Sequence, residues 1–219
     1  MSTPPFPDGK YRALVVDPPW MFQRQPPSVR PPYGLMSLDA IKALPIGELA
    51  ATSAHLYLWI PSALMEDGFP IIRAWGFNFK TVFTWVKHQV GLGSYLRNST
   101  EHALFAVRGR LPVLRRDIRN WVMADRRQHS RKPDEFYRIV EDLSPGPRID
   151  VFSREKRPGW DQWGDQSDFF NKEEGDKNGK PIAETAGSGG IVGSFDSHAL
   201  RVDERRDDPL PQGRATATV

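Results

Sequence analysis

The sequence predicts an α/β fold in which a mainly parallel sheet is flanked by helices. Residues 13–16 are all apolar and do not alternate with polar residues, which is typical of a strand buried on both faces. Further strand-like runs alternate along the chain with segments of helical character, as in βαβ proteins. A marked amphipathic helix near residue 133 leads directly into a further strand-like segment at 148–152. These observations together favour a sheet of parallel strands joined by helices.

The first part of the chain contains most of the expected elements. In chain order they are a strand at 13–16, a helix capped by Ser37 that ends before Pro45, a strand at 55–60, a helix at about 62–75, and strands at 79–87 and 102–108. The second helix is irregular because Gly68 and Pro70 fall inside it, and Gly76 ends it.

The last helix carries the clearest periodic signal. Four apolar residues between Phe136 and Leu143 fall at positions i, i+3, i+4 and i+7, and Pro133 suits the first helical position. A strand at 148–152 follows, but no glycine-rich turn comes after it. A cofactor at that strand end would therefore be held by side chains, which argues against a Rossmann dehydrogenase.

Composition bounds the class of protein. The 219 residues include no cysteine, which excludes a disulfide scaffold, a cysteine zinc site and a thiol nucleophile. The five histidines lack ligand spacing, so we expect no metal. No signal peptide or long apolar segment is present, so we expect a cytoplasmic protein without membrane contact. The domain should comprise residues 1–170, because residues 171–219 lose apolar periodicity and are expected to be a disordered tail.

Positive charge is concentrated in the expected domain. The net charge is +3, made up of +5 over residues 1–170 and −2 over the rest. Much of the excess is in a band interrupted by Trp121: Arg108, Arg110, Arg115, Arg116, Arg119, Arg126, Arg127, Arg131 and Lys132. Such a band suits a phosphate backbone. The alternative interpretation is a solvated face, the commoner fate of charged runs.

The first strand stops at the motif Asp17-Pro18-Pro19-Trp20. The carboxyl ends of strands in open α/β sheets are where ligands bind. Asp17 and a free Pro18 carbonyl could hold the exocyclic amine of a nucleobase, favouring the pyramidal nitrogen that attacks a methyl donor. Trp20 offers a stacking face for the base. The alternative interpretation is a proline-rich turn with a core tryptophan. The following proline-rich loop, residues 21–34, is interpreted as a substrate lid.

Four separated segments share a resemblance to one family. They are Asp17-Pro18-Pro19-Trp20, Pro32-Tyr33-Gly34 with Met36-Ser37, Trp85-Val86-Lys87 with Glu101-His102, and Lys132-Pro133-Asp134-Glu135 with Leu143-Ser144-Pro145-Gly146. In order and spacing this set resembles the MT-A family of adenine-N6 methyltransferases, named for the seventy-kilodalton catalytic subunit of the eukaryotic messenger-RNA adenosine methyltransferase. The match extends from about residue 11 to residue 166.

The resemblance implies a class I methyltransferase fold with permuted motif order and S-adenosylmethionine (SAM) as methyl donor. It implies a catalytic set of Asp17, Pro18, Pro19 and Trp20. It implies substrate contacts from Tyr33, Lys87, Arg127 and Ser130. It implies cofactor contacts from Asp17, Lys132, Arg154, Arg157, Asp165 and Gln166.

Three functions remain open at this point. The first is adenine-N6 methylation of nucleic acid, with DNA slightly preferred over RNA because of the small size and bacterial or phage character of the chain. The second is a catalytically silent partner subunit that binds nucleic acid; the intact Asp17 and Trp20 count against it. The third is methylation of a protein amide nitrogen, for which the resemblance implies Asn and Tyr at those two positions. The target sequence, the strandedness of the substrate, and a homo- or heterodimeric state are left open.

Overall fold

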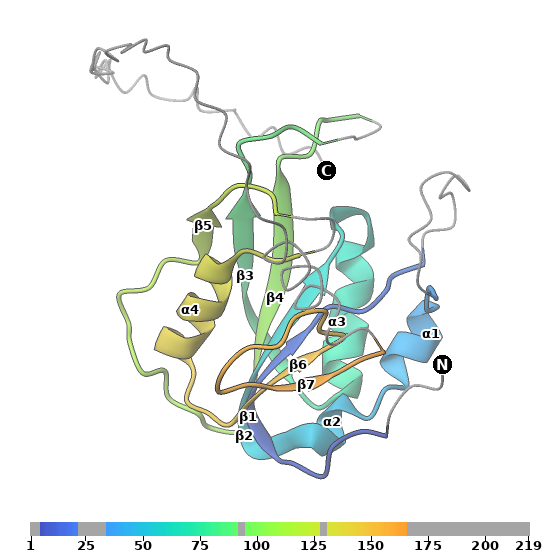
Figure 1. Cartoon of the computed structure of the whole chain (residues 1–219). Coiled ribbons are helices and arrows are strands. Elements are labelled where there is room, and N and C mark those ends of the chain that lie inside the picture. The colour runs from blue at the N-terminus through green and yellow to red at the C-terminus, as the bar shows by residue number, and fades with distance from the viewer. Residues whose placement is uncertain (1–4, 22–33, 92–94, 128–130, 166–219) are drawn as a thin grey trace, which may run out of the picture. The chain divides into compact units, whose positions relative to one another are not determined.

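The computed structural model describes residues 5–21, 34–91, 95–127 and 131–165 (Figure 1). Most of the expected lid, residues 21–34, and the whole expected tail, residues 171–219, lie outside this described part. No helix in the described part is long and apolar enough to cross a membrane.

The described residues form a seven-stranded sheet with the strand order β5-β3-β4-β2-β1-β6-β7. In chain order the strands are β1 Tyr11–Val16, β2 Ala50–Ile60, β3 Asn78–Val86, β4 Thr100–Arg108, β5 Trp121–Met123, β6 Arg148–Val151 and β7 Asp161–Trp163. Only β4 among them is antiparallel to its neighbours, β2 and β3. The prediction of a mainly parallel sheet is confirmed, with β4 as the exception.

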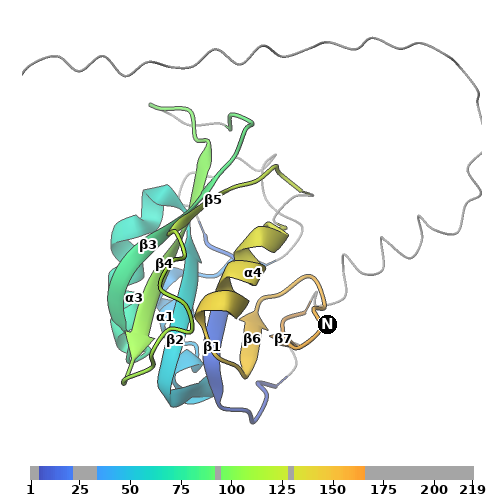
Figure 2. The ribbon, with the colours of Figure 1, turned by 90° about the vertical axis from the view of Figure 1, so that its left-hand side faces the viewer.

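Four α-helices cover the sheet. They are α1 Leu38–Lys42, α2 Ile46–Leu49, α3 Met65–Ala74, which a 3₁₀ turn Ser62–Leu64 precedes, and α4 Asp134–Leu143. The hydroxyl of Ser37 accepts a hydrogen bond from the Ala40 amide at 3.2 Å, so it caps α1 as predicted. Gly76, at φ +80°, follows α3 in the left-handed region that favours glycine. Figure 2 shows α1 and α3 on one face of the sheet and α4 on the other.

Two apolar clusters lie on the two faces of the sheet. Leu14 and Val16 of β1 pack in the cluster that contains α1, α2 and α3, whereas Ala13 and Val15 pack in the cluster that contains Phe136 of α4. Successive strand residues point to opposite faces, so a strand covered on both sides must be apolar throughout. This arrangement explains the unalternating run of β1.

The sequence did not predict α2, β5 and β7. Each has only three or four residues, too few to display a periodic pattern. Trp121 and Met123 of β5 are also exposed, which removes the apolar signal of a buried strand. The sheet therefore has two more strands than the sequence indicates. In addition, Pro133 is the residue before α4 rather than its first helical residue.

Candidate active site

Strand polarity brings the predicted site residues to one edge of the sheet. Val16 pairs with Leu58 of β2 and with Val151 of β6 in parallel register, so Asp17 follows β1 between the carboxyl ends of two neighbours. Because β4 is antiparallel, its amino-terminal end, with Glu101, reaches the same edge. Lys87 follows the end of β3 there. The single reversed strand thus adds a carboxylate to the edge that holds Asp17.

Lys132, just before α4, joins these residues into one chain of alternating charges. Its Nζ lies 2.8 Å from Oδ2 of Asp17 and 3.3 Å from Oε2 of Glu101. Lys87 Nζ donates to the other oxygen of Glu101. Lys132 is also 4.9 Å from the centre of the Trp59 ring, a cation–π distance. The four side chains therefore balance one another's charge, with the two lysines mostly buried and the two acids partly exposed. We call this set the charge chain.

The charge chain sets the ionisation of its members. Burial raises the pKa of Asp17, and Lys132 opposes that rise. Burial alone would also raise the pKa of Glu101, but Lys132 and Lys87 outweigh it and hold the value at about 2. Burial would lower the pKa of Lys132, but Asp17 and Glu101 raise it above its ordinary value. Lys132 and Glu101 therefore stay charged, while Asp17 is the member nearest to taking up a proton.

The Asp-Pro-Pro-Trp turn is tied to its surroundings by main-chain hydrogen bonds. The Pro18 carbonyl accepts from the Trp20 amide at 2.9 Å, and the Pro19 carbonyl accepts from the Met36 amide at 2.8 Å. The expectation that the Pro18 carbonyl is free is therefore wrong. A carbonyl oxygen has two lone pairs, so each can accept a further hydrogen bond.

Trp20 is a core residue. It is 6% exposed, packs in the cluster on the α3 side, and donates from Nε1 to the Trp59 carbonyl at 3.0 Å. This environment agrees with the structural alternative for its ring. Trp20 fixes the turn that presents Asp17, and any support it gives to a base stays a prediction.

A hollow beside Asp17 is enclosed by β1, β6, α4 and the segment after β6. We call it the inner hollow, and its lining residues are Asp17, Arg131, Lys132, Tyr137, Asp150, Phe152, Ser153, Arg154 and Glu155. Asp17, Lys132 and Arg154 of the predicted cofactor set are among them. Phe152 has φ +68°, a conformation that non-glycine residues rarely adopt, and it turns the chain directly after β6.

The inner hollow has a buried acid that the sequence analysis did not select. Tyr137 Oη donates to Oδ2 of Asp150 at 2.8 Å. Burial raises the pKa of Asp150 to about 7, against the opposing effects of Tyr137 and Arg157. The sequence offered a signal for this residue, because Asp150 lies inside the strand predicted at 148–152. Charged residues are almost never fully buried without a partner, so an acid in a buried strand indicates a polar site.

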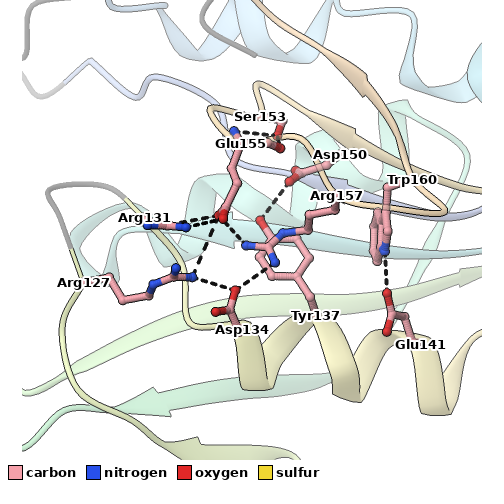
Figure 3. Close-up of polar contacts among 10 residues, drawn as sticks. All are labelled: Arg127, Arg131, Asp134, Tyr137, Glu141, Asp150, Ser153, Glu155, Arg157 and Trp160. Atoms are coloured by element: carbon pink, nitrogen blue, oxygen red, sulfur yellow. Dashed lines mark hydrogen bonds and ion pairs between the residues drawn. The ribbon is translucent and has the colours of Figure 1, made fainter. Parts of the chain in front are cut away.

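The other predicted site residues have different positions. Arg157 does not line the inner hollow; it donates to Asp134 at 2.8 Å and stacks on Tyr137 at 3.7 Å (Figure 3). Asp165 is exposed just after β7, at the same edge of the sheet. Tyr33, Ser130 and Gln166 lie outside the described residues.

The basic residues do not form one band. Arg108 is at the carboxyl end of the antiparallel β4, so it lies at the opposite edge of the sheet from Lys132, and it donates to the Gly47 carbonyl. Arg115 is paired with Asp117 and Asp142. Among the described residues, no group of three or more His, Asp or Glu could hold a metal ion.

Comparison with known proteins assigns this α/β domain to a family. The MT-A70 family model matches residues 11–166. A protein of Medicago truncatula named as a putative N(6)-adenosine-methyltransferase MT-A70-like is 32% identical over 169 residues, covering 72% of this chain and 26% of that protein. The catalytic subunit METTL3 of the Homo sapiens N(6)-adenosine-methyltransferase is 31% identical, covering 73% and 29%.

A shorter relative is covered over most of its length. The Type II methyltransferase M.MunI of a Mycoplasma species is 27% identical over 185 residues, covering 74% of this chain and 79% of that protein. By contrast, the chain spans about a quarter of the plant and insect relatives named as MT-A70-like. The chain belongs to the MT-A70 family. This finding confirms the family that the four sequence segments indicated.

Proposed function

We propose that this protein is a SAM-dependent adenine-N6 methyltransferase that acts on nucleic acid, with DNA slightly preferred over RNA. The proposal includes a class I methyltransferase fold with permuted motif order, in which the catalytic turn after β1 precedes the cofactor-side helix α4 and strand β6. The observation that carries it is the contact of Asp17 with Lys132 at the carboxyl edge of the sheet, beside a polar hollow, in a member of the MT-A70 family. We place the protein in the cytoplasm.

The residues around the inner hollow fit SAM. The methionine part of SAM carries a carboxylate and an ammonium group, and the hollow offers Lys132 and Asp17 for these two groups. The charge chain contains two acids and two bases, so it adds no net positive charge that would repel a sulfonium cation. Arg154, which lines the hollow, would hold the ribose and carboxylate ends together with Asp165 and Gln166. Arg157 lines only the outer hollow, so it would have to leave Asp134 and Glu155 to join them. When bound, SAM supplies a methyl group on a positively charged sulfur that leaves as a neutral thioether.

Asp17 acts on the nucleophile rather than on the methyl group. Its carboxylate accepts one N–H of the adenine amine, and the Pro18 carbonyl accepts the other through its second lone pair. These contacts favour the pyramidal nitrogen whose lone pair is available for in-line attack. The nitrogen gains a bond to carbon as the carbon–sulfur bond breaks, and it then loses a proton to Asp17 or to water. The raised pKa of Asp17 suits that last step.

Substrate contacts are proposed for Tyr33, Lys87, Arg127 and Ser130. Lys87 is held beside the charge chain by Glu101, and its Nζ lies 4.6 Å from the centre of the Trp85 ring. Pro19 and Trp20 hold the turn. A homo- or heterodimer is compatible with this arrangement.

The first experiment transfers labelled methyl groups from SAM to matched single-stranded DNA, duplex DNA and RNA, followed by nucleoside mass spectrometry. We expect N6-methyladenine in at least one polymer, and we expect Asp17→Ala to abolish it with an unchanged circular dichroism spectrum. Asp39→Ala, an exposed acid in the first turn of α1, is the control. Near-normal transfer by Asp17→Ala would remove Asp17 from the mechanism.

The same experiment separates the alternative functions. SAM binding without label in any nucleic acid would favour a missing partner subunit or a protein amide substrate. A protein that does not bind SAM would favour the silent-partner function.

A further inference from the structure

A cluster of ion-paired side chains separates the inner hollow from a second hollow on the outer side of α4. We call the second one the outer hollow; its lining residues are Arg127, Arg131, Asp134, Tyr137, Arg138, Glu141, Glu155, Lys156, Arg157 and Pro158. Arg131, Tyr137 and Glu155 line both hollows, so they form the wall between them. The outer hollow has more cations than acids, which suits the phosphates of nucleic acid.

Glu155 is the centre of this wall (Figure 3). Its Oε2 accepts from Nε of Arg131 at 3.0 Å and from Nη2 of Arg157 at 2.6 Å, and its Oε1 accepts a second hydrogen bond from Arg131. Arg127 Nη1 lies 3.9 Å from the same carboxylate. The side chains of Arg131, Glu155 and Arg157 are 5%, 15% and 14% exposed. Charge-assisted hydrogen bonds at such low exposure are little weakened by solvent.

The wall connects three parts of the chain. Arg127 and Arg131 come from the segment between β5 and α4, Asp134 begins α4, and Glu155 and Arg157 come from the connection between β6 and β7. Asp134 accepts from Arg127 at 2.6 Å and from Arg157 at 2.8 Å. The segment proposed to contact nucleic acid is thereby joined to the segment proposed to hold SAM.

The charge balance of the wall indicates that the link between these two segments depends on Glu155. Three guanidinium groups face two carboxylates. Without the charge of Glu155, Arg127 and Arg157 would share Asp134, and the bidentate contact of Arg131 with Glu155 would be lost. The guanidinium groups would then repel one another. The segment before α4 and the connection between β6 and β7 would no longer be held together by Glu155.

We propose that Glu155 is a positioning residue that couples the SAM site to the nucleic-acid site. This inference rests on the proposed function. A ligand in the inner hollow lies against Arg131 and Glu155, which line it, and Glu155 transmits its effect to Arg127, which lines the outer hollow that faces nucleic acid. Because coupling free energies are reciprocal, nucleic acid must tighten SAM-site binding by the same factor.

Isothermal titration calorimetry tests the coupling. The probe is S-adenosylhomocysteine, which cannot transfer a methyl group, titrated with and without a saturating adenine-containing oligonucleotide of the polymer that the enzyme methylates. We expect the oligonucleotide to lower the Kd of wild-type protein at least about fivefold, the lower end of typical coupling. In Glu155→Gln we expect the ratio of the two Kd values to be near one.

The ratio distinguishes coupling from a merely structural role. A structural defect would weaken both Kd values equally and leave their ratio unchanged. Asp117→Asn is the control, because it removes an exposed carboxylate from the ion pair with Arg115, outside the wall. It should keep the wild-type ratio.

An unchanged ratio in Glu155→Gln, or a wild-type ratio of one, overturns the coupling and leaves the proposed function intact if N6-methyladenine is formed. A wild-type protein that does not bind S-adenosylhomocysteine overturns both. If Glu155→Gln does not unfold cooperatively on heating, Arg131→Gln removes the same contact from the other partner. The ratio of the two Kd values is again expected to be near one.

Discussion

Lys132 is a mostly buried cation that contacts two acids. A lysine just before a helix faces the positive end of the helix dipole, which disfavours it. Asp17 and Glu101 compensate for this cost at 2.8 and 3.3 Å. The sequence indicated Asp17 and Lys132 separately, through the motif and the family resemblance. It did not indicate that Glu101 joins them, because only the reversed direction of β4 brings Glu101 to the same edge.

Replacement of Lys132 tests its proposed contact with the SAM carboxylate. A hydrogen bond between charged groups contributes about 1.5–3 kcal/mol, so Lys132→Ala should weaken SAM binding by roughly tenfold to a hundredfold. Binding of nucleic acid should change less. Calorimetry with each ligand checks this, with Lys80→Ala, an exposed lysine on β3, as the control. A larger loss for nucleic acid than for SAM would contradict the assignment.

Asp150 predicts a pH dependence of stability. Its folded pKa is about 7, whereas an acid in the unfolded chain titrates near pH 4. Between these values the folded state binds more protons than the unfolded state, so stability falls as pH rises from about 4 to 7. The full fall is at most about 4 kcal/mol, since each pKa unit corresponds to about 1.4 kcal/mol.

The measurement is urea unfolding of wild-type protein and Asp150→Asn across this pH range. The free energy of unfolding of wild-type protein should decline relative to that of Asp150→Asn as pH rises, because asparagine does not titrate. Other titrating groups contribute to both proteins and cancel in the difference. Parallel curves would show that Asp150 has an ordinary pKa.

At the scale of elements, a buried hydrogen-bonded chain joins β2 to the end of α4. His55 Nε2 lies 3.0 Å from the Leu111 carbonyl and must donate to it. His55 Nδ1 therefore accepts from the Ser144 hydroxyl at 2.8 Å, and Ser144 Oγ accepts from the Tyr57 hydroxyl at 2.7 Å. Ser144 Oγ has two partners in this chain and connects the side chains of His55 and Tyr57.

Removal of that connecting hydroxyl should destabilise the fold. Ser144→Ala leaves His55 Nδ1 and the Tyr57 hydroxyl buried without these partners, at a cost of about 1–3 kcal/mol for an unsatisfied group. Urea unfolding should show the loss. Ser62→Ala, in the exposed turn before α3, should change the free energy of unfolding little. Equal effects of the two substitutions would show that the chain contributes nothing.

Most of the strands that the sequence predicted have several consecutive buried residues. These are β1, β2, β4 and β6, and α4 has one continuous apolar face; β3 was predicted as well, although its first half is exposed. The strands β5 and β7 could not be predicted, because their three residues gain order from pairing with β3 and β6 rather than from their own pattern. The direction of β4 was also hidden, because a strand's composition does not record its polarity.

At the scale of the whole molecule, sheet polarity divides the basic residues into two groups. Arg126 follows β5 at the carboxyl edge, where the candidate active site lies, and Arg110 follows β4 at the opposite edge. Both are exposed. If adenine is held at Asp17 as proposed, we expect the first group rather than the second to contact the polymer.

This division predicts different salt dependences. Each phosphate contact contributes about 0.9 to the slope of log K against log salt for duplex DNA. Arg126→Ala should therefore weaken nucleic-acid binding and lower the magnitude of that slope by about one. Arg110→Ala should leave both unchanged. Fluorescence anisotropy at several salt concentrations measures the slopes, and a lower slope in Arg110→Ala would place the polymer at the other edge.

The strand order also has a consequence for synthesis on the ribosome. β1 lies between β2, which is the next strand along the chain, and β6, which begins only at Arg148. A nascent chain that has paired β1 with β2 still exposes the other edge of β1 until β6 emerges. Unpaired apolar edges recruit other chains, so this interval is when the protein is most open to aggregation and most in need of a chaperone.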